Sequence, residues 1–97
     1  MTPLTLKDYN KEVRDFSGGV ILFFTAKWAM PAIKTANFLQ STNLEIKIFS
    51  IDYDSERELV EQFSVRELPI VYFIRNGQTQ AFAYEVTTEA QLKALIK

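Results

Sequence analysis

The first part of the chain changes from a helical to a strand-like pattern at a pair of glycines. Leu6, Tyr9, Val13 and Phe16 are spaced like residues on one face of a helix, which predicts a helix that ends before the glycine pair. Residues 19–26 then form an unbroken apolar run, GVILFFTA, rich in β-branched and aromatic side chains. Such a run is typical of a strand that is covered on both faces.

A proline indicates where the next helix begins. Pro31 suits the first turn of a helix, because the N–H that it lacks would have no partner there. Apolar residues continue at helical spacing to Leu39, so we expect this helix to end near residues 41–43. Residues 44–53, LEIKIFSIDY, alternate between apolar and polar side chains and predict a second strand.

Capping motifs and a turn motif divide the second half of the chain. Ser55 and Glu58 have the spacing of a capping box and predict a third helix. The Asn-Gly pair at residues 76–77 separates two strand-like runs and is the strongest short hairpin signal. Thr88 and Gln91 form a second capping box, which predicts a final helix.

This order of elements predicts an α/β domain. A strand–helix–strand crossover followed by an antiparallel hairpin gives a mixed central sheet of four strands with helices on both faces. Residues 1–6 add a short edge strand as a fifth. Since no linker or repeat interrupts the pattern, we expect residues 1–97 to form a single domain. Tyr53, Tyr72 and Tyr84 fit half-buried positions of the sheet.

Composition and charge exclude several classes of function. The formal net charge is −1, so the charge balance gives no attraction to nucleic acid or to an anionic membrane. The longest apolar run, Val20–Phe24, is far too short to cross a bilayer. Residues 1–10 are mixed and polar and do not resemble a signal peptide, so we expect a cytoplasmic protein.

The chain contains neither Cys nor His. This excludes disulfides, thiolate nucleophiles, Cys/His metal sites and imidazole acid–base catalysis. Carboxylates remain at Asp52, Asp54, Glu56 and Glu58, with a spacing that suggests a metal site. A loop and a charged first helical turn explain them better, because the helix dipole favours negative charge there. We therefore expect no metal and no cofactor.

Four motifs resemble, in order and spacing, those of the thioredoxin family. FFTAKW ends a strand at Trp28, and AMPA follows at residues 29–32, where the family has Cys-x-Pro-Cys. Residues 51–69, IDYDSERELVEQFSVRELP, match the family's strand, helix and V-R-x-x-P segment, and IRNGQ at residues 74–78 matches its hairpin. The resemblance covers residues 6–96 and implies the thioredoxin fold, a mixed four- to five-stranded central sheet flanked by helices on both faces.

The resemblance also implies a site. In the family, a thiolate at a helix N-terminus attacks a disulfide through a mixed-disulfide intermediate. Ala29 and Ala32 stand at the two cysteine positions, and their methyl groups can neither attack nor leave. The resemblance further implies a groove for protein substrates or partners that bind as extended peptides, with strand-like pairing at the residue before a cis-proline. The groove residues are Trp28, Met30, Pro31, Leu68, Pro69 (the cis-proline) and Glu85.

Departures from the family pattern leave two origins open for the alanine pair. An engineered replacement of both cysteines, in a parent loop WCMPC, explains why Trp28, Pro31 and Pro69 are intact. Natural loss would explain why Phe23 stands where the family usually has a buried Asp. We favour the engineered form. Glu85 replaces a usual Gly, and we expect its charge to disfavour acidic peptides.

Two functions follow from this interpretation. The first is a thiol–disulfide oxidoreductase acting on protein disulfides, present here in a redox-inactive form. Its cysteine-bearing parent would be a protein-disulfide reductase, with a thioredoxin reductase as a partner. The alternative is a naturally redox-inactive module that binds proteins through the same groove. An enzyme that uses other residues would need a convergent pair of carboxylates, which the sequence does not indicate.

Overall fold

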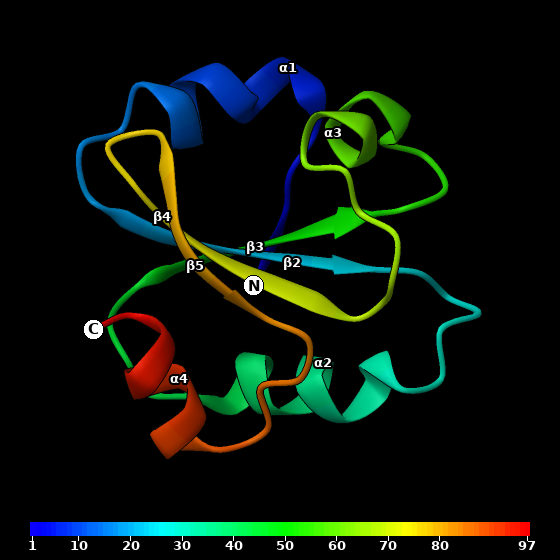
Figure 1. Ribbon diagram of the computed structural model, residues 1–97, viewed down its shortest axis with the longest axis vertical. Helices are drawn as coiled ribbons and strands as arrows, with labels where there is room; N and C mark the ends of the chain where they lie inside the picture. The colour runs from blue at the N-terminus through cyan, green and yellow to red at the C-terminus, as the bar shows by residue number, and fades with distance from the viewer.

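The computed structural model describes residues 1–97, in which a five-stranded sheet lies between two layers of helices (Figure 1). The order along the sheet is β1-β3-β2-β4-β5, and β4 runs antiparallel to both of its neighbours while the first three strands are parallel. The strands are β1 (Thr2–Pro3), β2 (Gly19–Thr25), β3 (Lys47–Asp52), β4 (Ile70–Arg75) and β5 (Gln78–Ala83). This mixed sheet confirms the predicted fold class.

The helices cover the sheet in pairs. One face carries α1 and α3, and the other carries α2 and α4 (Figure 1). The helices are α1 (Leu6–Tyr9), which continues as the π-helix η1 (Asn10–Arg14), α2 (Ala32–Ser41), α3 (Arg57–Gln62) and α4 (Glu89–Leu95). None of them has the length and hydropathy that a membrane span requires.

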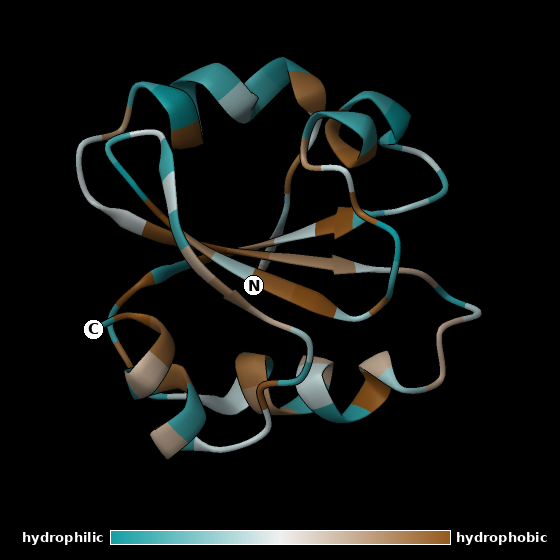
Figure 2. Ribbon diagram, viewed as in Figure 1, coloured by the Kyte–Doolittle hydropathy of each residue, from teal (hydrophilic) through white to brown (hydrophobic).

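The core consists of two apolar clusters separated by the sheet. Val20, Leu22 and Phe24 of β2 point into the cluster under α1 and α3, and Ile21 and Phe23 point into the cluster over α2 and α4. All five are at most 1% exposed, as the unbroken apolar run predicted. Figure 2 shows hydrophobic residues concentrated in the inner strands, between the helical layers. Burial of each such side chain contributes about 1.5–3 kcal/mol.

The hairpin between β4 and β5 turns at the predicted Asn-Gly pair. Asn76 and Gly77 both have positive φ, at 53° and 72°, the conformation that a two-residue type I′ turn requires. A Cβ atom on Gly77 would collide with the backbone carbonyl of Arg14, at the end of η1. Gly77 is therefore required both for its backbone conformation and for close packing against η1.

One predicted capping box is present and the other is wrong. Thr88 and Gln91 exchange side-chain and backbone hydrogen bonds at the start of α4, as predicted. At α3, however, the N-cap is Glu56, with no side-chain cap. The helix begins at Arg57, so Ser55 lies one residue before the N-cap, and its hydroxyl donates to Asp52 Oδ2 at 2.9 Å.

The predictions for the N-terminal helix and the second strand were partly wrong. The helix widens into a π-helical segment, in which Asp15 N–H donates to Asn10 C=O at 2.8 Å, and Phe16 lies outside it. β3 begins at Lys47, three residues later than expected at Leu44. Of the three tyrosines assigned to half-buried positions, Tyr53 and Tyr84 are partly exposed as predicted, Tyr84 at 49%, whereas Tyr72 is buried.

Replacing Gly77 with Ala tests the tight packing of the turn. We expect Gly77→Ala to lower the free energy of unfolding by on the order of 1–3 kcal/mol, because Ala disfavours positive φ and its methyl group meets Arg14. Urea denaturation monitored by circular dichroism measures the change. Asn76→Gly is the matched control and should alter stability by less than about 0.5 kcal/mol, since Gly accepts positive φ freely. Equal effects of the two substitutions would contradict this account.

Candidate functional site

The loop between β2 and α2 carries the predicted site. Successive turns shape it: Ala29 N–H donates to Ala26 C=O at 3.1 Å, and Ala32 N–H donates to Ala29 C=O at 2.9 Å. Pro31 occupies the N-cap of α2 with φ −60° and ψ −19°, values that already belong to a helix. The proline thus stands at the mouth of α2, where the first two helix N–H groups, those of Ala32 and Ile33, donate to the carbonyls of Ala29 and Met30.

Ala29 and Ala32 are buried, at 6% and 2% exposed. They lie in the apolar cluster over α2 and α4, and Leu68 packs against the same cluster. Pro69 is buried beside it, and the Leu68–Pro69 peptide bond is cis, as predicted. Segments nearly forty residues apart in sequence, the start of α2 and the start of β4, therefore contribute to one region.

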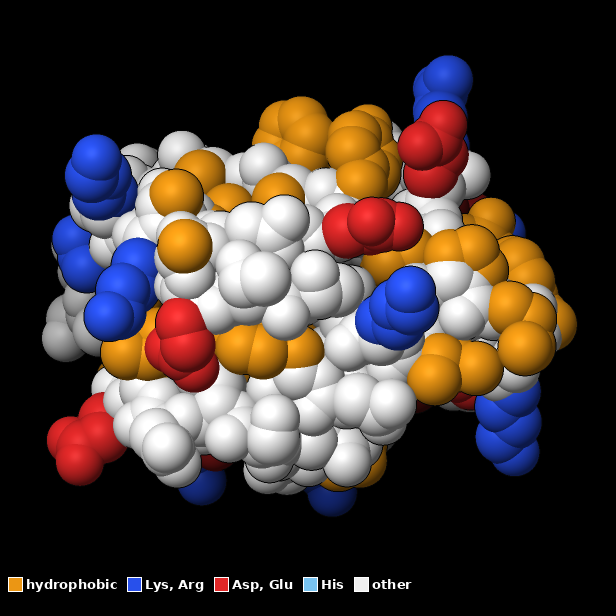
Figure 3. Space-filling view, turned by 90° about the horizontal axis from the view of Figure 1, so that it is seen from below, with side chains coloured by type: hydrophobic (Ala, Val, Ile, Leu, Met, Phe, Trp, Pro, Cys, Tyr) orange, Lys and Arg blue, Asp and Glu red, His pale blue; other side chains and the backbone are white.

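Apolar side chains are exposed around the buried alanines. Trp28 is 61% exposed, Met30 69% and Ile33 49%. Figure 3 shows hydrophobic side chains gathered at the right-hand end of the molecule, where the β2–α2 loop and the start of α2 lie in Figure 1. The sequence analysis did not include Ile33 among the site residues. Its place in the helix indicates its exposure, because the buried face of α2 runs through Ala32, Thr35 and Leu39 and leaves residue 33 on the outer face.

Trp28 is fixed in its exposed position. Its indole Nε1–H donates to Asp54 Oδ2 at 2.8 Å, and its ring meets Tyr53 edge-on with centroids 5.9 Å apart. The guanidinium of Arg57 lies over the Tyr53 ring, 4.7 Å from the ring centroid. A hydrogen bond to Tyr53 raises the pKa of Arg57, which favours its charged form. The residues after β3 therefore support the loop after β2.

The carboxylates near residue 54 have structural partners. Asp54 binds the Trp28 indole, Asp52 accepts from Ser55, and Glu56 Oε1 accepts from the backbone N–H of Leu6 at 3.0 Å. No group of three or more acidic side chains is placed to hold a metal ion. These hydrogen bonds account for the carboxylates without a ligand.

The environment of residues 29 and 32 contains no acid or base. All eleven buried residues of their cluster are apolar, and Phe23 is fully buried where the family resemblance leads one to expect a carboxylate. The one buried polar side chain nearby is Thr35, whose Oγ1 accepts from Val86 N–H at 3.3 Å. This bond ties α2 to the segment after β5. The site combines a helix N-terminus with a packed apolar cluster, and its two alanines carry no reactive atom.

Glu85 lies in that segment and is exposed. It borders a shallow groove of about 370 Å³ between β5 and α4. The groove is lined by Ala81, Phe82, Ala83, Glu85, Gln91, Ala94 and Leu95. The interactions of Trp28, by contrast, are with residues that follow β3. The structure thus brings together the alanines and Leu68, with Trp28, Met30 and Pro31 on the same loop, and places Glu85 beside α4.

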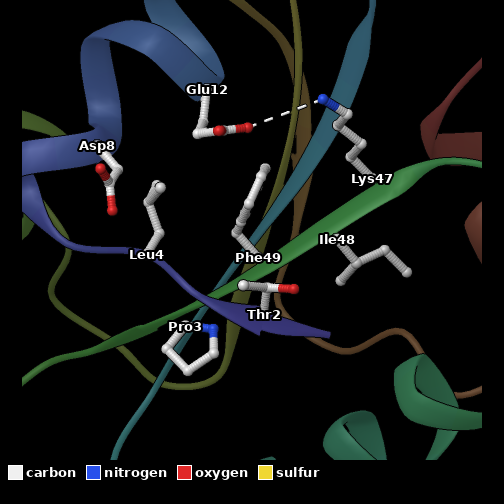
Figure 4. A pocket seen from close by; sticks show the side chains of 8 residues that line it. All are labelled: Thr2, Pro3, Leu4, Asp8, Glu12, Lys47, Ile48 and Phe49. Atoms are coloured by element: carbon white, nitrogen blue, oxygen red, sulfur yellow. Dashed lines mark ion pairs between the residues drawn. The ribbon is translucent and has the colours of Figure 1, made fainter.

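Two other hollows lie near the N-terminal segment. One of about 390 Å³ adjoins the loop at Ala26 and Lys27, at the carboxyl ends of the parallel strands. The other, about 340 Å³, lies at the β1 edge beneath α1 (Figure 4) and shares no residue with the candidate site. Its charged lining, Asp8, Glu12 and Lys47, includes an ion pair and is open to solvent.

Comparisons with known proteins identify the family. The family model described as Thioredoxin matches residues 1–97. Thioredoxin H5 of Oryza sativa subsp. japonica is 32% identical over 71 residues, which cover 70% of this chain and 53% of that protein, so the chain spans about half the length of this curated relative.

Solved structures of two thioredoxins share the fold. The thioredoxin of Malassezia sympodialis (Mala s 13) aligns with a TM-score of 0.80 at 18% identity, covering 95% of this chain and 85% of that one. The thioredoxin of Fasciola hepatica aligns with a TM-score of 0.81 at 21% identity, covering 99% and 96%.

The support of Trp28 by Asp54 is testable because Trp28 is the single tryptophan. We expect Asp54→Ala to lower the fluorescence anisotropy of Trp28 and to move its indole N–H resonance, since the ring loses its acceptor. The free energy of unfolding should fall by only about 0.5–1 kcal/mol, because the pair is exposed. Asp54→Asn keeps a carbonyl acceptor and should behave like the parent. An indole resonance unmoved in Asp54→Ala would show that the hydrogen bond does not hold the ring.

Proposed function

Because the chain belongs to the thioredoxin family, whose model matches residues 1–97, we propose that it is the scaffold of a thiol–disulfide oxidoreductase acting on protein disulfides, with both reactive sulfurs replaced by methyl groups. One observation carries the proposal. Ala29 and Ala32 are buried at the mouth of α2, in a cluster that also contacts Leu68, next to a cis-proline. A pair of side chains so placed lies where a helix N-terminus stabilises negative charge.

In a cysteine-bearing form, the chemistry would run in two steps. A thiolate at position 29 attacks one sulfur of a substrate disulfide, a mixed disulfide forms, and the other substrate sulfur leaves as a thiolate. The sulfur at position 32 then attacks the sulfur at position 29. This releases the reduced substrate and leaves an internal disulfide, so two electrons pass to the substrate. An external dithiol restores the starting state.

This chain contributes binding and positioning to such a cycle. The exposed Trp28, Met30 and Ile33 offer apolar contact to a substrate segment beside the reacting position. Met side chains adapt to varied partners, which suits a surface that meets many sequences. In the proposal, the backbone before Pro69 pairs with the substrate as an added strand, in the mode in which main-chain bonds give affinity.

The second step would lack an internal base. Position 32 faces only apolar neighbours, with Phe23 fully buried in the same cluster. Apolar surroundings raise the pKa of a thiol, so the buried sulfur would lose its proton to solvent and not to a side chain. In the proposal, Phe23 in place of an acid makes the attack of the position-32 sulfur on the mixed disulfide slow.

As it stands, the chain cannot exchange disulfides, because it contains no thiol. Our proposal is that both alanines replace cysteines of a parent protein by engineering, which the intact Trp28, Pro31 and Pro69 support. The proposal extends to a cytoplasmic location, as the sequence led us to expect, and to a thioredoxin reductase as electron donor of the parent, which rests on the family alone.

A second candidate function is a redox-inactive module that binds extended peptides. The observation in its favour is that three apolar side chains are exposed around a site without reactive atoms. In this case the natural gene would encode alanine at both positions.

Restoring the two sulfurs separates the candidates. We expect the double variant Ala29→Cys/Ala32→Cys to accelerate the reduction of insulin disulfides by dithiothreitol, measured as turbidity. The rate should exceed the uncatalysed rate at least roughly tenfold, which corresponds to about 1.4 kcal/mol of transition-state stabilisation.

Two single variants serve as controls. Ala32→Cys alone should stay inactive, because in the proposed cycle its sulfur attacks only a mixed disulfide already formed at position 29. Ala29→Cys alone should form mixed disulfides without turnover. A folded double variant with no activity above background would reject the oxidoreductase and favour the binding module.

A further inference from the structure

β5 leaves one edge of the sheet open. It is the last strand in the order and pairs only with β4. Every second backbone N–H and C=O group of such a strand points outward without a partner, and so offers a template for another strand. Nothing in the fold covers this edge, since α4 lies on one face of the sheet and α1 on the other (Figure 1).

The two edges of the sheet differ in how they discourage pairing. At the opposite edge, β1 has only two residues, one of them Pro3, and Lys47 of β3 pairs with Glu12 at 3.8 Å (Figure 4). Short strands, prolines and lysines are devices that prevent edge-to-edge association. Residues 76–84, by contrast, contain no charge and no proline.

Only the first half of β5 is locally protected. A bulge interrupts the β4–β5 register at Phe73/Ile74, and the Gln80 side chain donates to the carbonyl of Gln78 at 3.1 Å. Beyond it, Ala81 to Ala83 pair regularly with β4 and keep their outer edge open. The second half of the strand is therefore the part available to a partner.

The exposed half carries large side chains on one face and small ones on the other. Phe82 is 54% exposed and Tyr84 49%, and their rings meet edge-on at 5.8 Å, with Tyr72 6.0 Å behind Phe82. The other face presents Ala81 and Ala83 at the groove beside α4. In Figure 3, hydrophobic side chains gather at the upper edge, on the side of the molecule where β5 lies.

We propose that two copies of this chain associate through antiparallel pairing of β5 with β5 around a two-fold axis at Phe82. This pairing joins the two five-stranded sheets into a single ten-stranded sheet. Antiparallel pairing about such an axis sets each Phe82 opposite its counterpart, and each Ala81 opposite Ala83 of the second copy. Large side chains thus meet large ones, and small side chains meet small ones. The uncharged segment brings no like charges together in this self-complementary contact.

A second copy suits this edge better than a foreign peptide, because its β5 carries the same alternation of large and small side chains and so matches the first copy residue by residue. The contact is small: a short ladder with four half-exposed rings lies at the low end of specific interfaces. We expect a dissociation constant on the order of 10–100 μM, as such interfaces are weak. The inference does not rest on the proposed function, because Trp28 and Met30 take no part in the contact.

Sedimentation velocity over about 10 μM to 1 mM tests the association, a range that spans the expected dissociation constant. The average mass should rise from 11.2 kDa towards twice that value. Phe82→Lys should remain monomeric throughout, because two ammonium groups would meet at the axis. Ile33→Lys makes the same change at an apolar side chain of similar exposure on α2, and should dimerise like the parent. Thermal unfolding confirms that both variants fold.

Two further measurements use the parent and a charge pair. Amide exchange at residues 81–83 should slow as the parent is concentrated, while exchange at β1 should not change. An equal mixture of Phe82→Lys and Phe82→Glu should form a heterodimer at low salt. A parent that is monomeric at the highest concentration, a dimer that survives in Phe82→Lys, or a mixture that does not pair would each overturn the proposal.

Discussion

The double-sided burial of β2 is the constraint on which the rest of the structure depends. Its alternating side chains supply both apolar clusters, so the two helical layers are held to one strand. A strand buried on both faces must keep its backbone paired on both edges, which β3 and β4 provide. Where β2 ends, at Thr25, the chain leaves the centre of the sheet and enters the loop of the candidate site. The loop therefore starts from a strand that is buried on both faces and paired on both edges.

The fold keeps the shape of the site without its chemistry. Ala29 and Ala32 have a packing role in the cluster with Phe23, and a methyl group meets that requirement. The exposed ring of Trp28 is supported from another direction, by Asp54 and Tyr53. Reactivity and recognition therefore depend on different interactions in this scaffold. A change at the two alanines need not disturb the surface that would meet a partner.

Most of the fold follows from local signals in the sequence. The apolar run of β2, the turn at residues 76–77 and the cap at Thr88 each depend on residues within a few positions, and each prediction was confirmed. The cap predicted at Ser55 is absent because α3 begins one residue later, which makes Glu56 the N-cap and leaves Ser55 just before it. Motif spacing alone did not determine the first residue of this helix.

The candidate site was less accessible to sequence reasoning. Only a family resemblance linked Leu68 to the alanines, since contacts across nearly forty residues leave no periodic signal. The partner of the Trp28 indole was missed because the carboxylates near it looked like a charged helical turn. The burial of Tyr72 was mispredicted for a similar reason: strand order decides which strands lie inside the sheet, and alternation along the chain cannot reveal it.

The contact of the β4–β5 turn with η1 limits how the chain can be lengthened. Hairpin tips are usually among the safest places to insert extra sequence, because they project into solvent. Here the tip abuts the carbonyl of Arg14, from a segment some sixty residues earlier. Extra residues at this tip would push η1 away from the sheet and expose the apolar side chains beneath it. The length of this turn therefore determines how closely the β4–β5 hairpin packs against η1.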